Sequence, residues 1–222
     1  MISALAGLFA GLLHVFSGPD HLAAIAPLAV DVRRRAWITG LRWGFGHASG
    51  VLLVGIISLW LRDLLPLESI SAWSERLVGV LLIAIGLWGM RKAMNIHAHE
   101  HHHHGEAHVH VHIHGARQLH DNPKAHTHRH TAFGIGTLHG LAGSSHFLGV
   151  LPALAFNDTS DAVIYLISFA TGTVAAMTIF SSALSAVAGR ISVRFVDAYR
   201  NLMYICSVAA LLVGGYWLFA QS

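Results

Sequence analysis

Residues 11–29 read GLLHVFSGPDHLAAIAPLA, and residues 136–154 read GTLHGLAGSSHFLGVLPAL. At an offset of 125 residues (139 − 14 = 125), the two stretches share Gly, Leu, His, Gly, His and Pro at six matching positions. Chance composition rarely produces such a match, so we expect the chain to contain two copies of one structural unit.

Composition indicates that these units lie in a lipid bilayer. Hydrophobic residues make up 54% of the 222 residues and charged residues 11%, whereas ordinary soluble domains contain about 25% charged residues. Most of six apolar stretches reach the roughly 20 residues that cross a bilayer as a helix. The stretches are 1–30, 37–61, 73–91, 131–156, 162–188 and 199–220. The sequence therefore predicts an all-α integral membrane protein with six transmembrane helices.

The number of stretches in each copy predicts how the copies are oriented. Three crossings are an odd number, so the second copy must enter the membrane upside down relative to the first, as in many transporters. We expect two inverted three-helix repeats, residues 1–91 and 131–222, joined by a linker over residues 92–130.

The linker is rich in histidine and low in complexity. It contains 14 of the 19 histidines, and such a segment is expected to be disordered because it cannot bury a core. Its clustered imidazoles would capture metal weakly. Lys and Arg gather in the linker and in two shorter connections, near residues 33–35 and 190–200. The positive-inside rule then predicts a cytoplasmic linker and external termini, in a bacterial inner membrane or its equivalent.

A stripe of glycine and histidine runs along the first apolar stretch. Its residues are spaced four, three, four and three apart, which puts them on one helix face: Gly7, Gly11, His14, Gly18 and His21. Glycines on a membrane helix let another helix approach closely. Pro19 should kink the helix and free backbone carbonyls. Asp20 could bind metal, orient an imidazole or cap a half-helix.

Three more histidines fall inside apolar stretches. His139 and His146 belong to the second copy, and His47 lies in the second stretch within GFGHASG. Ionisable groups inside a membrane are costly and generally mark a pathway, although a single histidine such as His47 can equally serve an interhelical hydrogen bond. Five imidazoles and one carboxylate suit nickel, cobalt, zinc, iron or manganese rather than Cu(I). The predicted metal ligands are His14, Asp20, His21, His47, His139 and His146.

These motifs resemble a known family. HVFSGPDHLAAIAPLA, GFGHASG, the His-rich linker and LHGLAGSSH are similar to the nickel/cobalt transporter superfamily, especially to its UreH-like urease accessory membrane proteins. The resemblance implies nickel or cobalt as substrate. It also implies that His14, Asp20 and His21 take the part of the superfamily's His-x4-Asp-His signature. Here the spacing is His-x5-Asp-His, with the extra residue near Gly18.

The predicted function is transport of a divalent transition-metal cation, with nickel or cobalt leading, through a site between the first and fourth helices. We expect neither enzyme activity nor a resident cofactor, and the partners are the metal ion and the bilayer. Basic residues form no continuous face, so no nucleic-acid partner is expected. The short chain is compatible with a homo-oligomer.

Two other functions stay open at this point. One is a histidine-ligated redox protein, with haem between His14 and His139 or with a diiron centre. The other is a membrane protein that binds metal without translocating it. A thiol–disulfide carrier of the same three-plus-three plan would need a cysteine pair, and the sequence has Cys206 alone.

Overall fold

The structure is a computed structural model that describes residues 1–32, 35–61, 67–103, 106–113, 131–142, 149 and 151–219. Most of these residues are helical. The α-helices are α1 Ile2–Ser17, α2 Pro19–Val32, α3 Ala36–Leu61, α4 Leu67–Met94, α5 Thr131–Leu141, α7 Thr159–Arg194 and α8 Val196–Phe219. The remaining elements are the strands β1 Ile96–His103 and β2 Glu106–Ile113 and the short 3-10 helix η2 Leu151–Ala155. The predicted all-α class is thus confirmed for the described residues outside the two strands.

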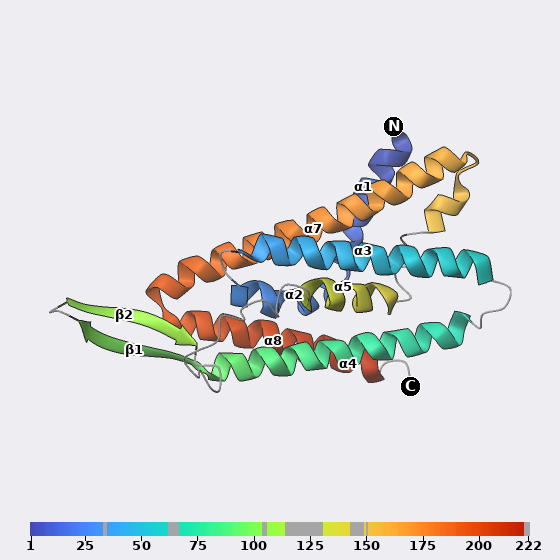
Figure 1. The fold of residues 1–222 in the computed structure, drawn as a ribbon. Helices are drawn as coiled ribbons and strands as arrows, with labels where there is room; N and C mark the ends of the chain where they lie inside the picture. The colour runs from blue at the N-terminus through green and yellow to red at the C-terminus, as the bar shows by residue number, and fades with distance from the viewer. Residues whose placement is uncertain are drawn as a thin grey trace, which may run out of the picture.

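The helices form layers around two short central helices (Figure 1). The long helices α3 and α7 lie on one side, α4 and α8 lie on the other, and α2 and α5 lie between them. Fully buried side chains from several of these elements meet in one core, including Ile25, Trp43, Leu82 and Met177. We call the end of the molecule from which the strands project the hairpin side. The N-terminus and the end of α8 lie on the opposite side.

The first apolar stretch is a broken helix. Residues 1–30 were predicted as one span with a kink, but α1 and α2 are separate helices bent by 74°. Gly18 ends α1 in an extended conformation, with φ −89° and ψ 101°, and its N–H donates to the carbonyl of His14. Pro19 then begins α2, a position where its missing N–H needs no partner and its fixed φ suits the helix. The proline starts a new helix instead of bending an old one.

Close glycine contacts hold α1 against α7. A Cβ atom added at Gly7 would overlap the carbonyl oxygen of Tyr165, and one added at Gly11 would overlap that of Phe169. The residue numbers rise together, so the two helices run parallel. The sequence predicted such an approach from the glycine stripe, and the partner helix is α7.

A similar contact joins α5 to α3. A Cβ at Gly136 would overlap the carbonyl oxygen of Trp43, and one at Gly140 would overlap that of His47. These helices also run parallel. By contrast, α4 and α8 run antiparallel, because Gly79 meets Gly214 whereas Gly86 meets Ser207.

The linker forms a hairpin over part of its length, where disorder was expected. β1 and β2 pair antiparallel, with Ile96 opposite Ile113 and His101 opposite His108. The sequence from Ala107 to Ile113 alternates histidine with Ala, Val or Ile, a period of two that suits a strand. Ile96 is buried against α8 and fixes the root of the hairpin. The domain boundaries 1–91, 92–130 and 131–222 stay predictions.

Several helices are suited to a bilayer. By length and composition, three described helices could cross a membrane: Glu75–Met94 of α4, Thr159–Ile191 of α7 and Val196–Phe219 of α8. The bent pair α1 and α2 gives a fourth if it counts as one span. Large apolar side chains cover the outer faces, such as Phe9, Ile205 and Leu212, which are 59%, 66% and 69% exposed. Lipid, unlike water, accommodates such a surface. The six-span count stays a prediction.

The glycine contacts give a test of the packing on one helix. Gly136→Ala should force α5 away from Trp43 and lower the apparent melting temperature in detergent, since overpacking typically costs about 1–3 kcal/mol. Gly134→Ala is the matched control, because a Cβ at Gly134 meets nothing within 4 Å. The control should be neutral or stabilising, given the better helix propensity of alanine. Equal melting temperatures for the two variants would contradict the α3–α5 contact.

Candidate metal site

The break between α1 and α2 brings five of the six predicted site residues together. His14 lies in the last turn of α1, Asp20 and His21 in the first turn of α2, His47 in α3 and His139 in the last turn of α5. His21, His47 and His139 have no exposed surface, and Asp20 is 4% exposed. His146, the sixth, lies outside the described residues. The role of these residues as metal ligands stays a prediction.

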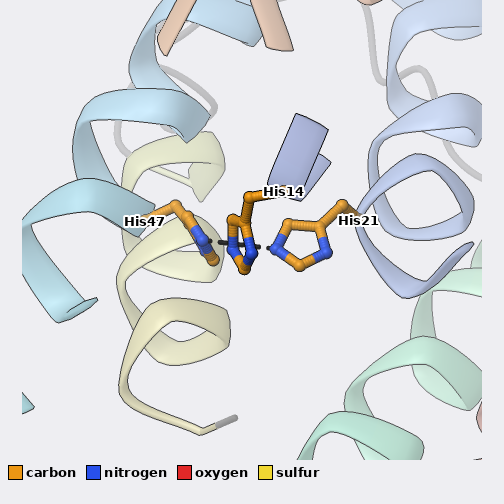
Figure 2. Close-up of side chains that lie close together, drawn as sticks. All are labelled: His14, His21 and His47. Atoms are coloured by element: carbon orange, nitrogen blue, oxygen red, sulfur yellow. Dashed lines mark hydrogen bonds between the residues drawn. The ribbon is translucent and has the colours of Figure 1, made fainter. Parts of the chain in front are cut away.

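Three imidazoles form one half of the cluster. Each of His14, His21 and His47 offers a ring nitrogen, and these atoms lie within 4.8 Å of one another. The Nε2 atoms of His21 and His47 are 3.3 Å apart, and the ring of His14 contacts that of His21 with centroids separated by 4.6 Å. Figure 2 shows the three rings converging from separate helices. His14 and His21 meet across the helix break, whereas the stripe predicted them on one continuous helix face.

The other half of the cluster consists of the Asp20 carboxylate and the two histidines that it contacts, His21 and His139. Its Oδ1 lies 3.0 Å from Nδ1 of His21, and its Oδ2 lies 3.3 Å from Nε2 of His139. A carboxylate only accepts hydrogen bonds, so Nδ1–H of His21 donates to it. In the neutral ring, Nε2 then keeps its lone pair, and that atom faces His47. Asp20 therefore orients a histidine of the first sequence copy while contacting one of the second.

Gly18 leaves room for this arrangement. A Cβ at Gly18 would overlap Nδ1 of His21 and lie 2.9 Å from Oδ1 of Asp20. Any side chain at this position would push the His21 ring out of the cluster. The stripe predicted that another helix packs closely against Gly18. In the structure the space beside Gly18 is instead filled by the side chains of Asp20 and His21.

Aromatic residues enclose the cluster, and the sequence did not single them out. Trp43 is fully buried with its ring 5.9 Å from that of His139, and Phe169 lies 5.5 Å from His14. Tryptophans of membrane proteins are enriched at the membrane–water interface, whereas Trp43 lies in the core. The sequence does not indicate which tryptophan is buried, because tryptophan occurs both in the core and at the membrane interface.

A cavity leads to the cluster from the side opposite the hairpin. Its volume is about 380 Å³, and its lining includes His14, Asp20, His21, Tyr165 and Trp217. The hydroxyl of Tyr165 donates to the carbonyl of Gly149 at 2.9 Å, which ties α7 to the segment before η2. The cavity therefore borders the cluster at His14, Asp20 and His21.

The spacing of the nitrogens and oxygens suits one bound cation. Imidazole nitrogens and carboxylate oxygens lie about 2.0–2.2 Å from an ion such as Zn²⁺, so two ligands of a tetrahedral site lie roughly 3.4 Å apart. The 3.3 Å between the Nε2 atoms of His21 and His47 is close to this value. The second group, Asp20, His21 and His139, also keeps its ligand atoms within 4.8 Å. His21 belongs to both groups.

Residues 4–216 match the family described as the cytochrome c biogenesis protein transmembrane region. The chain belongs to this family. It is an integral membrane protein, as its composition predicted. No solved structure matches the sequence.

Three relatives refine this assignment. The chain is 31% and 33% identical over 215 residues to Chloroplast protein FOR GROWTH AND FERTILITY 1 and 2 of Arabidopsis thaliana. These matches take in 96% of the chain, which spans 58% and 55% of the two relatives' lengths. It is 24% identical over 222 residues to Urease accessory protein UreH of Bacillus sp. (strain TB-90), matching 96% of the chain and 89% of the relative.

The predicted resemblance to UreH-like membrane proteins is thereby confirmed. The family is described as a transmembrane region and one relative is named a urease accessory protein, in agreement with the prediction that the chain is not an enzyme.

Asp20→Asn tests how the carboxylate serves the cluster. Asparagine loses the negative charge that faces His21 and His139, so Co²⁺ affinity should fall by about 10–100-fold, as for other groups that orient metal-binding histidines. The affinity would be measured by absorption titration in detergent, with residues 97–130 replaced by a flexible spacer so that linker histidines do not compete.

Asp158→Asn is the matched control. Asp158 caps α7 on the surface, where hydrogen bonds from the hydroxyl and backbone N–H of Ser160 lower its pKa. Asparagine caps helices about as well as aspartate, so Co²⁺ affinity should not change. An Asp20→Asn protein with the affinity of the unaltered chain would exclude Asp20 from the site.

Proposed function

We propose that the chain carries a divalent transition-metal cation across the membrane through the cluster of His14, Asp20, His21, His47 and His139. One observation carries the proposal: five potential ligands from four helices meet at a helix break that a cavity reaches. Ionisable side chains inside a membrane are costly, and their convergence indicates a pathway more readily than it indicates packing. Broken helices form substrate sites in many transporters.

The ligand set favours borderline metals, with nickel or cobalt leading. Neutral imidazoles and one carboxylate suit nickel, cobalt, zinc, iron and manganese, whereas Cu(I) prefers thiolates and thioethers. The similarity to a relative named as a urease accessory protein supports nickel or cobalt within this group. Since a histidine side chain binds metal only in its neutral form, protons would compete with the cation.

Helix pairing supports two inverted repeats. In the proposed arrangement α1 with α2, α3 and α4 form the first repeat, and α5 with the following segment, α7 and α8 form the second. The parallel pair α1 and α7 then corresponds to the parallel pair α5 and α3, while α4 and α8 run antiparallel to each other. An inverted duplication requires this pattern of directions.

The cluster geometry argues against haem and diiron. The ring of His21 contacts both His14 and His139, with centroid separations of 4.6 Å and 4.9 Å. A haem held between His14 and His139 would need the space that His21 occupies. A histidine-ligated diiron centre must supply ligands to two metal ions, more than the five residues that the cluster offers among the described residues. A thiol–disulfide carrier would need a second cysteine besides the buried Cys206.

The hairpin side is the cytoplasmic side in this proposal. Basic residues near the helix ends on that side include Arg35, Arg91, Lys92, Arg190 and Arg200, and the positive-inside rule assigns them to the cytoplasm. A cysteine introduced as Gly105→Cys, with Cys206→Ala as background, should escape an impermeant thiol reagent added outside intact cells. Labelling there before the cells are opened would invert the topology.

Flux into sealed vesicles tests transport itself. The unaltered chain should carry Ni²⁺ or Co²⁺, with Mn²⁺, Zn²⁺ and Fe²⁺ run beside them. His21→Ala should reduce the flux most, because His21 belongs to both ligand groups. Asp158→Asn again serves as the control and should transport normally. Metal binding without flux in the unaltered chain would identify a membrane protein that binds metal and does not translocate it.

A further inference from the structure

A second cavity lies on the hairpin side of the cluster. Its volume is about 420 Å³, and its polar and aromatic lining comes from four helices: Asp31, Thr39, Trp88, Lys92 and Thr131. The Asp31 side chain is 15% exposed, and Lys92 forms an ion pair with its Oδ1. The cavity is therefore lined mainly by apolar side chains, among which its one carboxylate already has a cation beside it.

Two helices connect this cavity with the cluster. On α2, Asp31 follows Asp20 by eleven residues, which is three helical turns and roughly 16 Å along the same face. On α5, Thr131, Ile135 and His139 are spaced four residues apart, with Thr131 and Ile135 lining the cavity and His139 in the cluster. Leu28 of α2 and Ile135 also pack against the buried core. Apolar side chains of α2 and α5 thus lie between the cluster and Asp31.

Lys92 has a second favourable contact in the same cavity. Its Nζ lies 5.1 Å from the centre of the Trp88 ring, and an ammonium over an indole face is stabilised by the ring quadrupole. Lys92 can leave Asp31 and keep a partner for its charge. A flexible four-carbon side chain makes such a displacement easier for lysine than for a residue with a shorter arm.

Building on the proposed transport function, we propose that Asp31 is a second binding position for the transported cation, on the hairpin side, and that Lys92 occupies it between transport events. A cation that passes Leu28 and Ile135 would displace Lys92 toward Trp88 and bind the Asp31 carboxylate. While the ion pair stands, its ammonium repels cations at this mouth of the route.

A structural tie between α2 and α4 is the competing explanation for the ion pair, and flux separates the two. Asp31→Asn should lower Ni²⁺ flux by about tenfold or more, because a carboxylate that holds the ion is lost. Ni²⁺ affinity of the cluster in detergent should not change. Lys92→Gln keeps the carboxylate and should retain or raise the flux.

The double variant decides between these explanations. Asp31→Asn with Lys92→Gln should be as slow as Asp31→Asn alone. A structural tie predicts equal losses in the two single variants and recovery in the double variant, and that result would overturn the proposal. The matched control is the exposed pair of Arg200 and Asp197, 2.8 Å apart, where Asp197→Asn should leave flux unchanged.

Accessibility tests the position without relying on flux. Thr39→Cys, in a chain carrying Cys206→Ala, places one thiol in the cavity for charged thiol reagents added from the hairpin side. Adding Lys92→Gln should raise the ratio of cationic to anionic labelling rates by about tenfold, because the nearby carboxylate is no longer neutralised. Ni²⁺ bound at Asp31 should slow labelling of Thr39→Cys in the protein that carries Lys92→Gln. Ni²⁺ should not slow labelling when Asp31→Asn is added to that protein.

The outcomes separate the two proposals. Suppose that Ni²⁺ protects Thr39→Cys from labelling and that the unaltered chain shows no flux. Transport would then be refuted, whereas Asp31 would still be a cation-binding position. Absence of protection in the Lys92→Gln protein would overturn the Asp31 position, whatever the unaltered chain transports.

Discussion

The carboxylate of Asp20, held at the start of α2 between two histidines, is the interaction around which the centre of the molecule is arranged. A carboxylate buried among membrane helices needs compensation, and here His21 and His139 lie at 3.0 Å and 3.3 Å from its two oxygens. Three features make this geometry reachable: the helix break at Gly18, the absence of a side chain there, and the close packing of α5 on α3 through Gly136 and Gly140. A larger residue at Gly18, or at Gly136 or Gly140, would remove the space that this geometry needs.

Some of this centre follows from the sequence and some does not. The internal match pairs His14 with His139, and Pro19 after Gly18 predicts a disturbance of the helix at the place where the structure has its break. The contact between His21 and His47 depends on how α2 packs against α3, and no local pattern encodes that angle. The same holds for Asp31 and Lys92, whose interaction joins separate helices. High histidine content predicts disorder in the linker, whereas the alternation of His with Ala, Val or Ile from Ala107 to Ile113 is the local signal for a strand.

Family membership and site chemistry answer different questions about this chain. The match over residues 4–216 assigns the membrane scaffold, but a scaffold accepts many functions, and the function has to be argued from the side chains it holds. A thiol relay would need two cysteines, whereas this sequence has one, buried in α8. At the helix break it has imidazoles and a carboxylate instead. Chemistry at that position therefore points to a cation, even though the family description names a different process.

In the proposed function, charge would allow the cluster to release the cation that it binds. Neutral imidazoles and one carboxylate leave a divalent cation with a net charge of +1, so the ion remains incompletely compensated in a medium of low dielectric constant. A second carboxylate in the cluster would neutralise the ion and hold it longer. Asp31 lies three helical turns away and is neutralised by Lys92 in the structure, so it would attract the ion only after Lys92 has moved. In the proposed transport, the separation of the two carboxylates along α2 would replace one strong binding site by two weaker ones. Conduction across a membrane requires such weak, successive binding.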